Sequence, residues 1–328
     1  MILSNDTISM KPPYQITPYI LAKVASISEK LGEIKAARLH KPPTELRKKN
    51  RIRTIHSSLV IEGNTLTLDQ VTALLENKRV MAPLKDITEV KNAIHTYQEF
   101  GLFNPYSIES LCQAHETLMK GLIDNAGKIR TQPVGIVKGG QLAHVAPSGS
   151  LVRPLLNELF DYLEHDEDLL IIKSCVFHYE FEFIHPFLDG NGRMGRLWQS
   201  VILTKYNPAF EYLPIESLIR ENQEEYYHAL ALADSQGSST VFIEFMLRII
   251  EESLEELLQS QNVTLSGSDR IDLFREYIDN RYFTRKDYLR YFKELSTATA
   301  SRDLKEAVEN KLLSKEGEKS LTRYKFNA

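Results

Sequence analysis

The spacing of apolar residues constrains the fold of this chain most, because almost the whole sequence repeats at the period of an α-helix. Residues 17–38 and 45–62 carry apolar side chains three and four positions apart, and Gly63 follows where a helix end is expected. The same period predicts helices over 107–122, 151–164, 167–184, 191–206 and 242–258. The sequence therefore predicts a mainly α fold.

One segment, 130–147, departs from the helical period. Apolar residues between Val134 and Val145 flank a Gly139-Gly140 pair. Two short apolar runs around a glycine turn are typical of a β-hairpin. We therefore expect a hairpin inside an otherwise helical protein.

Composition excludes several classes of protein. No run approaches the ~18 apolar residues of a transmembrane helix, and no basic segment with an apolar core opens the chain, so neither a membrane span nor a secretory signal is expected. Cys112 and Cys175 make no metal or disulfide spacing, which suits a reducing cytoplasm. The formal net charge of −4 argues against general polyanion binding. We expect a folded, cytoplasmic protein.

The polar stretch 259–268 is the best linker candidate in the chain. After it, residues 267–328 hold 14 basic and 11 acidic side chains, a balance of +3. We expect an N-terminal helical region over 1–105, a central domain over 106–258 and a small C-terminal domain over 269–328.

Residues 185–196 read HPFLDGNGRMGR and carry the chemistry that the sequence predicts. The preceding helix must end before Pro186, and a new helix starts near Asn191. Gly190 and Gly192 therefore lie at a helix N-terminus, where unpaired backbone N–H groups and the helix dipole favour an anion.

Four charged or titratable side chains surround this turn. Arg193 and Arg196 share one helix face, and both can bind phosphate oxygens. Asp189 offers a hard oxygen ligand for Mg²⁺, and His185 is a base that titrates near neutral pH. The plainer interpretation is a helix–loop–helix turn with surface arginines. The combination of residue types favours phosphate-transfer chemistry.

The string resembles the signature of the Fic domain, His-Pro-Phe-x-Asp/Glu-Gly-Asn-Gly/Lys-Arg-x-x-Arg, and every position matches. The similarity extends over about 106–248. It implies an all-α bundle with a β-hairpin flap that uses ATP and Mg²⁺ to transfer AMP to a Ser, Thr or Tyr hydroxyl of a protein target. The enzyme class implied is protein adenylyltransferase.

The resemblance also implies a role for each charged residue of the string. His185 would deprotonate the target hydroxyl as general base. Asp189 would hold Mg²⁺ between the α- and β-phosphates. Arg193 and Arg196 would bind the β- and γ-phosphates and so align the α-phosphorus for in-line attack.

The small residues of the string complete the implied phosphate site. Asn191 and the backbone around Gly190 and Gly192 would stabilise the charge that develops on the α-phosphate. Gly192 also separates branches of the family, because the phosphotransferases carry lysine there. AMP transfer is therefore favoured, and phosphoryl transfer stays an alternative.

The hairpin corresponds to the flap of the family, whose exposed strand edge would dock an extended segment of the target protein. The flap residues expected against nucleotide and target are Val134, Gly135, Ile136 and Val137. Tyr226-Tyr227 resembles a stretch that lines the adenine pocket. Because adjacent helical residues cannot both face one pocket, we expect Tyr227 to contact adenine.

Residues 58–63, from Ser58 to Gly63, resemble the inhibitory motif of the family class with an N-terminal intramolecular inhibitor. A carboxylate in the last turn of a helix opposes the helix dipole at a cost of ~0.3–1 kcal/mol, so a facing cation would stabilise it. We expect Glu62 to pair with Arg196 and to displace the γ-phosphate. The alternative is a solvated glutamate before a capping glycine.

Residues 269–328 resemble a winged helix, which would contact protein or DNA. A second function class is therefore a DNA-binding regulator in which the Fic-like body only senses nucleotide. Self-modification, a homodimer and removal of AMP from modified targets also stay open, and no motif identifies the target protein.

Overall fold

The computed structural model describes residues 11–36, 43–138, 141–259, 265–279, 281–293, 295–318 and 322–327, with side chains left out over 136–145. These residues are mainly helical, as predicted. The chain divides into two compact units, and each is described by itself. The larger unit holds residues 1–40 and 48–259, and the smaller holds 41–47 and 260–328.

The larger unit is a bundle of α-helices with one hairpin and two short 3₁₀ turns. Its elements, in chain order, are α1 (Pro18–Ala36), α2 (Thr44–Ile61), α3 (Leu68–Leu75), α4 (Leu84–Gln98), η1 (Phe100–Leu102), α5 (Ile108–Met119), β1 (Gly135–Lys138), β2 (Gln141–Val145), α6 (Gly149–His165), α7 (Leu170–Ile184), α8 (Asn191–Tyr206), η2 (Pro208–Tyr212), α9 (Ile215–Glu221), α10 (Gln223–Gln236) and α11 (Thr240–Gln259).

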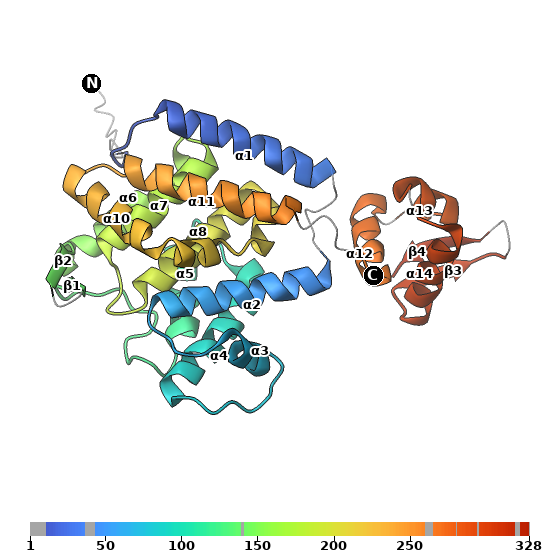
Figure 1. The fold of residues 1–328 in the computed structure, drawn as a ribbon, viewed down its shortest axis with the longest axis horizontal. Coiled ribbons are helices and arrows are strands. Elements are labelled where there is room, and N and C mark those ends of the chain that lie inside the picture. Colours follow the sequence, from blue (N-terminus) through green and yellow to red (C-terminus); the bar gives the residue numbers. More distant parts are fainter. Residues whose placement is uncertain are drawn as a thin grey trace, which may run out of the picture. The chain divides into compact units, whose positions relative to one another are not determined.

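Helices α7 and α8 form the centre of this bundle and pack against each other. α7 is apolar around nearly its whole circumference, which is typical of a helix buried on all sides. Trp198 of α8 is fully buried. Figure 1 shows α1 and α11 side by side along one edge of the bundle, and α2 to α4 along the opposite edge. The loop between α7 and α8 is therefore held by two rigid, buried helices.

Local sequence signals account for several helix starts. The Thr67 side chain accepts a hydrogen bond from the Gln70 backbone in a reciprocal capping box, and Ser107 caps α5 by accepting from the Ser110 backbone. Each cap satisfies a backbone N–H that has no partner within its helix.

The predicted hairpin is present. β1 and β2 are antiparallel, with Gly135 opposite Val145 and Lys138 opposite Gln141, and the register shifts after Ile136. The Gly139-Gly140 turn lies outside the described residues. The hairpin follows α5 in the chain and precedes α6, so both of its ends return to the helical bundle.

The smaller unit contains α12 (Gly267–Ile278), α13 (Arg285–Tyr291), α14 (Thr297–Glu309) and an antiparallel hairpin of β3 (Leu313–Glu316) and β4 (Arg323–Phe326). A β-bridge joins Phe283 to Tyr324, and Phe274 is fully buried in a core of its own. The assignment of this unit as a winged helix stays a prediction.

Over the part of the chain that the structure describes, no helix combines the length and the apolar character needed to cross a membrane.

Candidate active site

The predicted base, His185, lies at the C-terminal end of α7 in a left-handed backbone conformation. Its φ is 51° and its ψ is 62°, and its backbone N–H donates to the Phe181 carbonyl. The left-handed region is unfavourable for a residue with a Cβ, so surrounding contacts must hold it there. Pro186 follows and stops the helix, as predicted. His185 is half-buried, at the junction of a rigid helix and the loop.

The loop after His185 is braced from within by Asn191. The Asn191 side chain accepts from the Phe187 backbone N–H at 2.9 Å and donates to the Phe187 carbonyl at 2.8 Å. Asn191 is 2% exposed, and the Phe187 ring is fully buried. Phe187 is thus the apolar anchor of the loop.

A second brace comes from His115 on α5, a residue that the sequence did not single out. Its ring stacks on Phe187 at 3.7 Å between centroids, and its Nε2 lies 2.9 Å from the Asp189 carbonyl oxygen. Its Nδ1 accepts from the Gly127 backbone N–H at 2.8 Å, so Nε2 carries the proton and donates to Asp189. The loop therefore depends on a neutral His115.

The first turn of α8 begins at Asn191, directly after Gly190. Gly190 has a φ of 83°, and a Cβ there would lie 2.7 Å from the Met119 sulfur, so only glycine fits. The Asp189 side chain is 56% exposed, and one of its oxygens accepts from the Gly190 N–H at 2.6 Å. The N–H groups of the first turn have no partner within the helix. Such N–H groups favour an anion, and the solvated Asp189 carboxylate lies next to them in the chain.

Arg196 is buried inside the bundle and is held by the end of α2. Its guanidinium donates to the Ser58 hydroxyl at 3.2 Å, to the Ser58 carbonyl at 2.9 Å and to the Glu62 carboxylate at 2.8 Å. Burial lowers the pKa of Arg196, but the Glu62 carboxylate, together with Tyr226 and Glu182, more than offsets this effect, and the pKa is raised. The pair predicted from the sequence is thus in hydrogen-bond contact.

Gly192 makes the approach of Glu62 sterically feasible. A Cβ on Gly192 would lie 2.4 Å from a Glu62 carboxylate oxygen and 3.2 Å from a terminal nitrogen of Arg196. Real Cβ atoms do not come that close, so a side chain at 192 and this position of Glu62 exclude each other.

Arg193 is held by a different helix, α4. Its guanidinium lies 3.3 Å from Glu89 and 3.4 Å from Asp189. Glu89 also accepts from the Asn64 side chain at 2.8 Å, and Asn64 directly follows the predicted inhibitory motif. No described residue accepts the buried Nε–H of Arg193.

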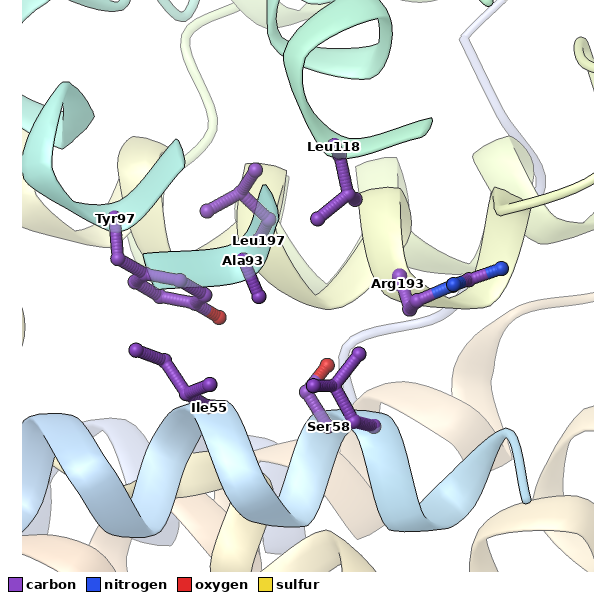
Figure 2. A pocket seen from close by; sticks show the side chains of 8 residues that line it. Ile55, Ser58, Ala93, Tyr97, Leu118, Arg193 and Leu197 are labelled. Atoms are coloured by element: carbon purple, nitrogen blue, oxygen red, sulfur yellow. The ribbon is translucent and has the colours of Figure 1, made fainter. Parts of the chain in front are cut away.

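The helices that hold the two arginines, α2 and α4, both contribute side chains to one cavity. Figure 2 shows Ile55 and Ser58 of α2 facing Ala93 and Tyr97 of α4 across a small cavity, with Arg193 at its edge. The cavity measures about 10 Å³, close to the smallest volume that holds one water. Side chains of α2, α4 and α8 therefore line one small cavity.

The nucleotide contacts predicted around the flap are described only in part. Val134 is half-buried and Gly135 is exposed, whereas the side chains of Ile136 and Val137 lie outside the described residues. Their contacts stay predictions.

The two candidate adenine contacts on α10 differ in burial. Tyr226 is fully buried, with its hydroxyl 3.1 Å from Nε2 of His178. Tyr227 is half-buried, which leaves it as the tyrosine of the pair that a ligand can reach. Its contact with adenine stays a prediction.

Sequence reasoning missed Glu89, His115 and Arg130, although each touches the predicted loop or an arginine in it. None stands in a local pattern that distinguishes it from an ordinary helical or loop residue. Their roles follow from how α4, α5 and the segment before β1 approach the loop.

Comparison with known proteins places this arrangement in a family. Residues 105–203 match the model of the Fic/DOC family. A crystal structure of a Fic family protein from Desulfovibrio desulfuricans is 40% identical in sequence and superposes with a TM-score of 0.75. The superposition covers 97% of this chain and 99% of that chain. The chain belongs to the Fic/DOC family.

Curated relatives of this Fic protein carry names that state an activity. Protein adenylyltransferase fic-1 of Caenorhabditis elegans is 29% identical over 237 residues, which cover 66% of this chain and 44% of the relative. Protein adenylyltransferase Fic of Nematostella vectensis is 27% identical, and the alignment covers 82% of this chain and 62% of that relative. The chain thus spans about half the length of the curated relatives it matches.

The His115 brace predicts a pH effect on the stability of the protein. Burial lowers the pKa of His115 from its usual 6.5 to about 4. Between these two values the unfolded chain binds a proton at His115 and the folded chain does not. Stability should fall as the pH drops from 6.5 to about 4 and level off below. Urea unfolding, followed by fluorescence of the single tryptophan, Trp198, measures this in the larger unit.

His115→Gln is the control, because glutamine keeps a donor for the Asp189 carbonyl and does not titrate. In this window its free energy of unfolding should depend on pH less steeply than the wild type, by up to about 1.4 kcal/mol per pH unit. Equal slopes in the two proteins would contradict the role given to His115.

The Arg193–Glu89 pair predicts a second stability effect. Glu89→Gln keeps the side-chain shape but leaves the buried charge of Arg193 with only the exposed Asp189, which should lower the free energy of unfolding by about 3 kcal/mol. In an Arg193→Gln background the same change should cost much less, because no buried cation remains. An equal loss in both backgrounds would rule out the pairing.

Proposed function

We propose that this protein transfers AMP from ATP to a hydroxyl side chain, Ser, Thr or Tyr, of a target protein. The observation that carries the proposal is the loop from His185 to Arg196, which brings a base, a solvated carboxylate, a helix N-terminus and two buried arginines to one place. The names of the curated relatives support the same reaction.

In the proposed reaction, the target hydroxyl oxygen attacks the α-phosphorus of ATP and pyrophosphate leaves. His185 takes the proton of the hydroxyl as the new bond to oxygen forms. The backbone N–H groups at the start of α8, including that of Asn191, stabilise the charge on the α-phosphate, and the Asn191 side chain braces the loop through Phe187. Arg193 and Arg196 bind the β- and γ-phosphates and align the in-line attack.

Asp189 fits a magnesium site of the kind that works with nucleotides. Mg²⁺ is commonly bound by one or two carboxylates together with substrate phosphates, and Asp189 is a single, solvated carboxylate beside the anion site. Among the described residues, no cluster of three or more His, Cys, Asp or Glu could hold a metal without a substrate. Bound Mg²⁺ would neutralise phosphate charge; Asp189 would orient it.

The same proposal includes autoinhibition by Glu62. The contacts of Arg196 with Ser58 and Glu62 occupy the donors that the γ-phosphate needs. ATP that enters this state meets a carboxylate where its terminal phosphate belongs, so its α-phosphate is not aligned with His185. Gly192, where family phosphotransferases have lysine, leaves the room that Glu62 occupies.

We also propose that the target docks on the strand edge of the flap, that the protein is cytoplasmic, and that a winged helix contacts protein or DNA. Self-modification, a homodimer and removal of AMP from modified targets stay open. Each of these can be tested separately from the AMP transfer itself.

Paired labelling tests AMP transfer and its inhibition together. Wild type, Glu62→Gly and His185→Ala are incubated with Mg²⁺ and with ATP labelled at the α- or the γ-phosphate, alone and with cell lysate. Protein-bound α-label should rise at least about tenfold in Glu62→Gly, which corresponds to about 1.4 kcal/mol, and should be absent in His185→Ala. γ-Label should not be incorporated.

Glu76→Gly is the matched control. Glu76 also lies at a helix C-terminus, contacts cations (Lys48 and Lys78) and is 33% exposed, against 31% for Glu62. It lies away from the loop and should leave labelling at the wild-type level.

Protein-bound γ-label would mean phosphoryl transfer, and ATP binding without label in any variant would favour the nucleotide-sensing regulator. Equal labelling by wild type and Glu62→Gly would refute the autoinhibition alone.

A further inference from the structure

Arg130 lies between α5 and the hairpin, and its side chain reaches the catalytic loop. Its guanidinium donates to four backbone carbonyls: His185 at 2.6 Å, Gln132 at 2.7 Å, Pro147 at 2.8 Å and Ile184 at 3.0 Å. Arg130 is 3% exposed. It therefore uses nearly all of its N–H groups on carbonyls instead of on an acid.

The choice of partners is unusual for a buried arginine. Arg193 and Arg196 both contact carboxylates, whereas no carboxylate among the described residues pairs with Arg130. Burial lowers the pKa of Arg130, which shows that its charge is kept at an energetic cost. An apolar side chain in its place would leave four backbone carbonyls without these donors.

Two of the carbonyls belong to the end of α7. The last carbonyls of a helix have no partner within the helix, and a cation favours this negative end of the helix dipole. Arg130 caps the helix through Ile184 and fixes the carbonyl of His185, which is in the left-handed conformation. The Arg130 backbone N–H also donates to the Pro186 carbonyl at 2.9 Å.

The other two carbonyls flank the hairpin. Gln132 precedes β1 and Pro147 follows β2. One planar guanidinium thus joins both ends of the hairpin to the backbone of His185. The fixed geometry of its N–H groups sets distances and directions together, which a lysine ammonium cannot do.

We propose that Arg130 is a positioning residue that holds the base His185 and the two ends of the flap in one fixed arrangement. This inference rests on the proposed AMP transfer, in which His185 must meet a target hydroxyl presented by the flap. Arg130 acts through backbone carbonyls and does not touch the reacting atoms. Its loss leaves the arginines of α8 in place and misaligns base and target.

The test compares Arg130→Lys and Arg130→Ala with the parent in the full-length, active Glu62→Gly background. Arg270→Lys is the matched control, since Arg270 is also buried, 8% exposed, and contacts Asp303 in the smaller unit. For both Arg130 variants, kcat for α-label transfer should fall about 10- to 100-fold, while the Kd for Mg-ATP changes less than about threefold. Added guanidinium should partly restore Arg130→Ala, and methylammonium should not.

Hydrogen exchange on the ATP-free protein gives a readout that does not depend on activity. In both Arg130 variants the amides of 184–187 and of the hairpin ends, 131–135 and 146–149, should exchange faster together, with the rest of the chain unchanged. Faster exchange in only one segment, or a fall in kcat that matches the fraction unfolded, overturns the inference. Absence of α-label in the parent refutes the proposed function, and the exchange result still decides whether Arg130 joins loop and flap.

Discussion

A guanidinium buried in a helical bundle needs acceptors, and the rest of this site is arranged around that requirement at Arg196. The side chain is almost fully buried, and Ser58 and Glu62 supply its hydrogen bonds. Removal of one partner from a buried ion pair leaves an uncompensated charge, which costs about 3–5 kcal/mol. An acidic or phosphate oxygen beside Arg196 therefore stabilises the folded protein. In the proposed function, Glu62 and the γ-phosphate compete for this one guanidinium.

The backbone conformation of the loop from His185 to Gly192 gives Glu62 the space that this competition requires. Gly190 takes the left-handed conformation that ends the loop, and its missing Cβ leaves room for Met119. Gly192 leaves room for the Glu62 carboxylate. His185 takes the same left-handed region with a full side chain, and its carbonyl is fixed by Arg130. Glycine therefore stands where the loop makes close contacts. At His185, which needs its side chain, the neighbouring Arg130 holds the left-handed backbone instead.

The helices, the hairpin and the cluster from His185 to Arg196 could be predicted because their signals are local. Helical periodicity, capping residues and a contiguous string act within a few positions of the chain. The pairing of Glu62 with Arg196, 134 positions apart, was accessible only through resemblance to a family motif. Glu89 and Arg130 gave no signal, since a glutamate on an amphipathic helix and an arginine before a strand are ordinary residues. Their roles arise only when tertiary packing brings them to the loop.

Glu62 follows the end of α2 and Glu89 lies on α4, yet the structure joins them through one short turn. Asn64, two residues after Glu62, donates to Glu89 and to the Asp86 carbonyl, and Thr65 donates to the Asp86 carboxylate. Asn64 is itself buried, so these bonds are not readily replaced by water. A displacement of Glu62 that carried this turn along would disturb Glu89 as well. The acids that face Arg196 and Arg193 are therefore linked through this one turn.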